Sequence, residues 1–66
     1  MKTIYIEGMM CEHCKKHVED AFLNLGIKAN VSLQDKKAII DQEFDDKKII
    51  DAINDAGYKV KEIING

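Results

Sequence analysis

The residues of this chain best suited to chemistry are its two cysteines, Cys11 and Cys14. They are separated by Glu12 and His13, so their thiolates can bind one soft metal ion between them. No third cysteine is present to complete a closed zinc site. An open dithiolate of low coordination number favours Cu(I) and, chemically, Hg(II) or Ag(I).

The predicted surroundings of the two cysteines favour their thiolate form. Cys14 lies at or near the first turn of a predicted helix, and Cys11 lies in the loop before it. Backbone N–H groups point outward at a helix N-terminus and the helix dipole is positive there, so the thiol pKa falls below its free value of about 8.5. Because the site is open, an incoming thiolate can bind before an outgoing one leaves, and metal can pass on without being released.

Four residues are candidates for a position next to the cysteines. Met9 is expected to pack inward under the loop, whereas Met10 is expected to face solvent, where it can contact a partner. His13 can donate a third ligand, but an exposed imidazole that tunes local charge is the favoured interpretation. Tyr58 is expected in the core or with its hydroxyl over the metal loop, because neutral phenol is a poor ligand for soft metals. His17 is interpreted as a helix-surface residue.

The elements that must position these residues follow from hydrophobic periodicity. Apolar residues alternate in the strand segments and recur every three or four residues in the helical ones. Phe22 lies on such a helical stripe and is expected to be deeply buried, whereas Ile39-Ile40 leaves the facing of its strand uncertain. The predicted order is a strand over 2–7, a helix over 14–25, strands over 27–33 and 37–41, a helix capped by Asp45 or Asp46 and ending before Gly57, and a strand over 58–63.

This order, βαββαβ, predicts an α+β fold of the ferredoxin-like type. Two short helices can cover one face of a four-stranded antiparallel sheet in that arrangement. The 66 residues predict a single domain over 1–66 with a thin hydrophobic core.

Composition excludes several classes of function. The formal net charge is −2 with acids and bases interspersed, so no basic surface for nucleic acid is expected. No apolar run approaches the roughly 20 residues of a membrane span, so direct membrane insertion is not expected. No secretory leader is visible, and two cysteines in such a chain predict reduced thiols and a cytoplasmic location.

The chain as a whole resembles the heavy-metal-associated domain family, in particular its small bacterial copper chaperones. The resemblance rests on Gly8-Met9-Met10-Cys11-Glu12-His13-Cys14, which matches the family's G-M-x-C-x-x-C, and on Asp55-Ala56-Gly57-Tyr58. It implies a ferredoxin-like fold that binds Cu(I) through Cys11 and Cys14. It also implies that Met9 is the family's buried methionine, that Tyr58 is the tyrosine typical of bacterial members, and that His13 fits the Cys-x-His-Cys pattern.

What the resemblance implies for function is copper transfer rather than enzymatic catalysis. The implied partner is a copper-transporting P-type ATPase, with a copper-responsive repressor as a second candidate and a metal-bridged homodimer as a self-association. Alternatives within the family are a mercury-binding protein, for which a leader is expected, and a metal-binding domain of the ATPase, for which linker residues are expected at the ends. Outside the family, the alternatives are a thiol–disulfide oxidoreductase and half of a zinc site shared between two chains.

Overall fold

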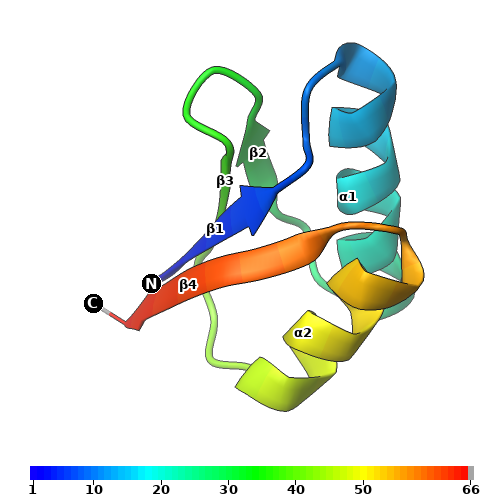
Figure 1. The fold of residues 1–66 in the computed structure, drawn as a ribbon. Coiled ribbons are helices and arrows are strands. Elements are labelled where there is room, and N and C mark those ends of the chain that lie inside the picture. Colours follow the sequence, from blue (N-terminus) through cyan, green and yellow to red (C-terminus); the bar gives the residue numbers. More distant parts are fainter. Residues whose placement is uncertain (66) are drawn as a thin grey trace.

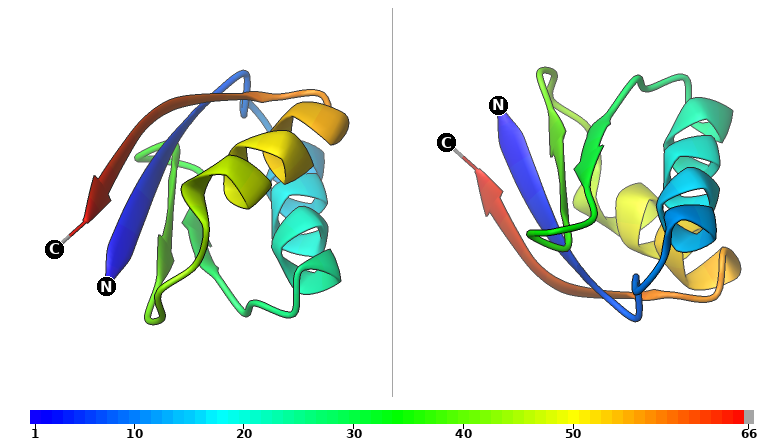
Figure 2. Two further views of the ribbon diagram at one scale, coloured as in Figure 1. Left: turned by 90° about the horizontal axis from the view of Figure 1, so that it is seen from below. Right: turned by 90° about the horizontal axis from the view of Figure 1, so that it is seen from above.

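The chain forms a four-stranded antiparallel sheet with both helices on one of its faces (Figure 1). The structure is a computed structural model, and it describes residues 1–65. In chain order the elements are β1 (Lys2–Glu7), α1 (Glu12–Asn24), β2 (Asn30–Ser32), β3 (Lys37–Ile40), α2 (Asp46–Asp55) and β4 (Lys59–Asn65). The strands lie in the order β2-β3-β1-β4. Two further views show both helices against the same side of the sheet (Figure 2), which confirms the predicted ferredoxin-like βαββαβ fold.

The core fills the space between the sheet and the helices. The pairing of β1 with β3 sets Ile4 opposite Ala38, and both side chains are fully buried. Ile40 is buried on the same face, whereas Ile39 pairs with Thr3 on the other face, and this settles the facing of β3. Each helix buries a stripe of side chains in the core, and Phe22 is among them, as predicted. The large buried side chains of the two helices are those of Val18, Phe22, Ile49 and Ile53.

Both helices end in the same glycine-dependent turn. Gly26 after α1 and Gly57 after α2 have positive φ values of 80° and 96°. In each case the residue after the glycine donates its backbone N–H back into the last turn, Ile27 to Phe22 at 3.0 Å and Tyr58 to Ile53 at 3.1 Å. This is the Schellman arrangement, which satisfies carbonyl groups at the helix end and reverses the chain at once.

Predicted boundaries were wrong in several elements, including the last strand, which runs over Lys59–Asn65 and not 58–63. α1 begins at Glu12, earlier than the predicted residue 14, because the chain becomes helical directly after Cys11. β2 is confined to Asn30–Ser32, not 27–33. Ile27 is buried as its apolar character demands, but its N–H is bonded to the end of α1 and cannot join the sheet. Within residues 1–65, neither helix has the length and apolar character needed to cross a bilayer.

Candidate metal centre

The two cysteines occupy the first turn of α1 in different environments. Cys11 is the N-cap residue with an extended backbone (φ −149°, ψ 171°), and its carbonyl accepts the Lys15 N–H at 3.0 Å. Its side chain makes no capping hydrogen bond and is exposed. Cys14 is half-buried and packs against the core. The predicted placement of Cys14 in the first turn and of Cys11 just before the helix is therefore confirmed.

The two sulfur atoms lie close together. The Cys11 Sγ donates to the Cys14 Sγ across 3.3 Å, so Cys14 is the acceptor of the pair. The pKa of Cys14 is lowered from 9.0 to about 7, chiefly by a hydrogen bond from the Tyr58 hydroxyl and then by backbone hydrogen bonding at Met10 and by the Cys11 thiol. Desolvation of Cys14 opposes this shift. Cys14 is therefore the thiol of the pair that is set up to be a thiolate near neutral pH.

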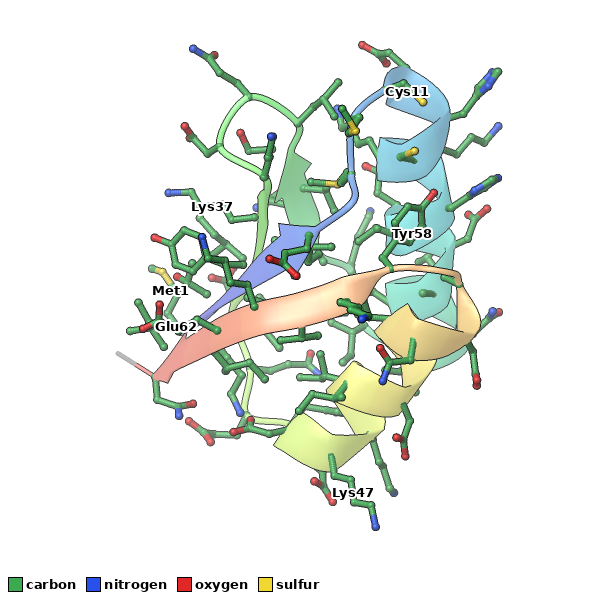
Figure 3. All side chains as sticks on the ribbon, viewed as in Figure 1. Met1, Cys11, Lys37, Lys47, Tyr58 and Glu62 are labelled. Carbon is green, nitrogen blue, oxygen red and sulfur yellow. The ribbon has the colours of Figure 1, made fainter. Side chains whose placement is uncertain are left out.

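Tyr58 reaches this site from the opposite end of the sequence. It directly follows Gly57, and the turn there directs its side chain toward α1 (Figure 3). Its ring lies beside the metal loop, where a Cβ atom added to Gly8 would meet the Tyr58 Cδ1 at 3.5 Å. The hydrogen bond to Cys14 raises the pKa of Tyr58 from 10.0 to about 12, with desolvation adding to the effect. The phenol thus stays neutral and acts as a hydrogen-bond donor beside the thiolate.

The other predicted neighbours take separate positions. Met9 is fully buried under the loop and Met10 is 79% exposed, as predicted for each. His13 is exposed on α1. Over residues 1–65 there is no group of three or more histidine, cysteine or acidic side chains arranged to hold a metal ion.

The sequence-based interpretation missed the position of His17. It was expected to lie only on the helix surface, yet its Nδ1 is 3.3 Å from the Tyr58 hydroxyl oxygen. The signal for this was present in the sequence, because a residue three positions after Cys14 in a helix lies on the same face one turn later. The structure therefore brings His17 to the tyrosine hydroxyl that lowers the pKa of Cys14.

The fold and the exposed dithiol together define a metal-binding domain of a known class. Residues 3–59 match the heavy-metal-associated domain family, and the chain belongs to that family. It is similar to the copper chaperone CopZ of Staphylococcus saprophyticus, with 46% identity across 91% of this chain and 96% of that protein. Among solved structures, a CopZ metallochaperone superposes with a TM-score of 0.80 at 32% identity, covering 91% of this chain and 98% of the other. A copper-binding domain from HMA7, a P-type ATPase, gives a TM-score of 0.80 at 31% identity, covering 97% and 93%.

Proposed function

We propose that this chain is a copper chaperone that binds one Cu(I) through Cys11 and Cys14 and transfers it by ligand exchange. The observation that carries the proposal is the pair of sulfurs 3.3 Å apart at the start of α1, one of them with a pKa of about 7. Two thiolates suit the low coordination number of Cu(I), whereas zinc takes about four ligands. Relatives named as copper chaperones support copper over other soft metals.

The different exposures of the two cysteines suit binding and release. With metal–sulfur bonds of about 2.3 Å, sulfurs 3.3 Å apart must separate before an ion can sit in line between them. Cys11 can move because its side chain is exposed and caps nothing, whereas Cys14 is held by the core. We infer that Cys14 is the fixed ligand and that Cys11 opens to receive and release the ion.

The proposed recipient is a copper-transporting P-type ATPase. Support comes from the similarity of this fold to a copper-binding domain of such an ATPase, because two alike dithiol sites can share one ion during exchange. A copper-responsive repressor is a second proposed recipient. A homodimer bridged by metal is proposed on the same chemistry, since an open dithiolate can complete its coordination with a second copy. The exposed Met10 is proposed to contact the partner.

Within this proposal the chain carries copper and does not catalyse a reaction. It is also proposed to act as a single domain in the cytoplasm. Membership in a metal-binding family supports the carrier role. A mercury-binding protein, a piece of an ATPase and a thiol–disulfide oxidoreductase are the competing functions. Parallel assays of Cu(I) transfer to an isolated ATPase domain and of insulin reduction distinguish a carrier from an oxidoreductase.

An anaerobic Cu(I) titration against a competing chelator tests the binding step. We expect one tightly held Cu(I) per chain in the wild type and none in Cys11→Ser/Cys14→Ser. The matched control is His13→Ala, which should keep the one-to-one stoichiometry because the two thiolates already satisfy Cu(I). Sizing chromatography at each step reports the metal-bridged dimer. Chelator-resistant copper in the double serine variant would place the site elsewhere.

A further inference from the structure

The face of the sheet that lies away from the helices is open. Both helices pack on the other face, and nothing from residues 1–65 covers this one (Figure 2). The strand registers place two rows of side chains on the open face, and β3, β1 and β4 each give one residue to each row. These residues form the open-face patch: Ile39, Thr3 and Ile64 in the first row, and Lys37, Tyr5 and Glu62 in the second. All of them are at least partly exposed to solvent.

The second row carries opposite charges at its two ends. Lys37 on β3 and Glu62 on β4 lie on either side of β1, on the side of the sheet away from the helices (Figure 3). Two strand spacings separate them, about 10 Å, which is too far for an ion pair. Lys37 is 4.0 Å from Asp35, and Glu62 forms no salt bridge with any of residues 1–65. An acidic and a basic group are therefore both available to an approaching surface.

This arrangement is complementary to a second copy of itself. If two open faces meet about a two-fold axis that runs along β1, each β3 lies over β4 of the other copy. Lys37 then faces Glu62 and Ile39 faces Ile64, and each contact occurs twice. Tyr5 faces its own equivalent at the centre, where two rings can stack with an offset. A two-fold axis running across the strands would instead set Lys37 against Lys37 or against Ile39, so charge and apolar character together select the axis along β1.

We propose that this chain forms a weak, metal-independent homodimer in which the open-face patches of two copies pack face to face. Packed sheets lie about 10 Å apart, a distance that isoleucine and tyrosine side chains fill. The patch has only six residues per copy, which predicts an interface of the small, weak class. The interface leaves the cysteines free because they lie at the start of α1 on the covered side of the sheet. Since the axis runs along β1, both metal loops emerge at the same end of the dimer.

Sedimentation equilibrium tests whether this dimer forms. Reduced wild type in a metal chelator should shift from monomer to dimer as its concentration rises toward about 1 mM, the range of weak association. Cys11→Ser/Cys14→Ser should associate to the same extent, because the cysteines take no part. A monomer at every concentration would leave the open face to another partner or to solvent and would overturn the proposal. A dimer that is lost in the double serine variant would overturn it too, because the cysteines would then join the two copies.

Charge reversal tests which surface joins the two copies. Lys37→Glu alone or Glu62→Lys alone should weaken the dimer roughly tenfold, because each places like charges together twice. Both changes in one chain should restore the wild-type affinity. A mixture of the two single variants should form mixed dimers, because the facing charges are then opposite again. The matched controls are Lys48→Glu and Asp51→Lys on the exposed side of α2, which change the net charge equally and should leave the dimer unaffected.

Isotope-filtered NMR on a mixture of labelled and unlabelled chains tests the predicted contact directly. We expect cross-peaks between Ile39 of one chain and Ile64 of the other, which lie about 10 Å apart within one chain. Contacts through α1 or α2 instead, or a dimer indifferent to the charge reversals, would refute the proposal. None of these measurements uses copper, so a wild type that binds no Cu(I) would refute the proposed function while leaving this result intact.

Discussion

The metal site is asymmetric at the scale of single residues. Cys14 is half-buried, accepts a hydrogen bond from Cys11 and has its pKa lowered by the Tyr58 hydroxyl, whereas Cys11 is exposed at the N-cap. The sequence predicted a lowered thiol pKa from the helix N-terminus alone. In the structure, the Tyr58 hydroxyl lowers the pKa of Cys14 more than the backbone N–H groups do. Sequence reasoning left this open because it could not fix the direction in which the Tyr58 hydroxyl points.

Removing the Tyr58 hydroxyl should raise the pKa of Cys14. In Tyr58→Phe the largest stabilising contact of the thiolate is lost, so the pKa should move from about 7 toward its ordinary 9.0. Thiolate ultraviolet absorbance as a function of pH measures this directly. Because the folded pKa lies below the unfolded one, the unfolded chain binds more protons between about pH 7 and pH 9, and wild-type stability should rise with pH across that window.

The stability contribution of the Cys14 thiolate is fully present above about pH 9 and is lost as the pH falls through about 7. Tyr58→Phe should flatten this rise in thermal midpoint between pH 7 and pH 9. The matched control is Tyr5→Phe, because Tyr5 lies on the face of β1 opposite the buried Ile4 and Ile6 and should leave the titration unchanged. Superimposable curves for wild type and Tyr58→Phe would mean that the hydroxyl does not serve Cys14.

At the scale of elements, the turns that end the two helices also position the residues that follow them. Sequence reasoning ended the helices before Gly26 and Gly57, which is correct, but the Schellman turns also decide where the next side chain goes. One turn buries Ile27 outside the sheet and shortens β2, and the other sends Tyr58 to the cysteines. Periodicity alone predicted a strand at Ile27 because a buried apolar residue looks the same whether its backbone pairs with a strand or with a helix end.

Lys2 is an element-scale feature that the sequence did not predict. It lies in β1 and is only 3% exposed. Its Nζ donates to the Phe44 carbonyl at 2.8 Å and forms an ion pair with Asp46 at the start of α2. Alternation along β1 places position 2 on the same face as Ile4 and Ile6, but it does not show which partners a lysine there would have. The buried ammonium ties the first strand to the second helix, because a buried charge needs its partners.

Removing the partner of Lys2 should destabilise the domain. Asp46→Asn keeps the shape of the side chain but removes the negative charge, so we expect a loss of about 1–2 kcal/mol, moderated by the partial exposure of Asp46. Chemical denaturation in urea measures the change. The control is Asp51→Asn on the same helix, which is exposed and should stay within about 0.5 kcal/mol of wild type. An equal loss of stability in Asp46→Asn and Asp51→Asn would show that the Lys2–Asp46 ion pair does not stabilise the domain.

At the scale of the whole molecule, the core and the metal site are nearly separate. The buried residues come from β1, β2, β3, the inner faces of both helices and Ile27 after α1, and the metal loop adds only Met9. Cys14 touches the edge of this cluster and Cys11 lies outside it. The overall fold was predictable from sequence because two apolar helix stripes and alternating strands specify one arrangement. The polar contacts at the site were not, because each depends on the final relation of two distant elements.

This separation predicts a domain that folds without metal. Reduced, metal-free wild type should show a single cooperative thermal transition by circular dichroism, because its apolar core forms without help from the thiols. Cys11→Ser/Cys14→Ser should unfold within several degrees of it, since a change of about 1 kcal/mol moves the midpoint of so small a domain by roughly 4–8 °C. The two proteins should be compared near pH 7, where only part of the Cys14 thiolate contribution is present. Cu(I) should then raise the midpoint of the wild type and not of the double variant, because only a ligand that binds the folded state stabilises it. A disordered metal-free wild type would instead place this chain among domains whose folding is driven by the metal.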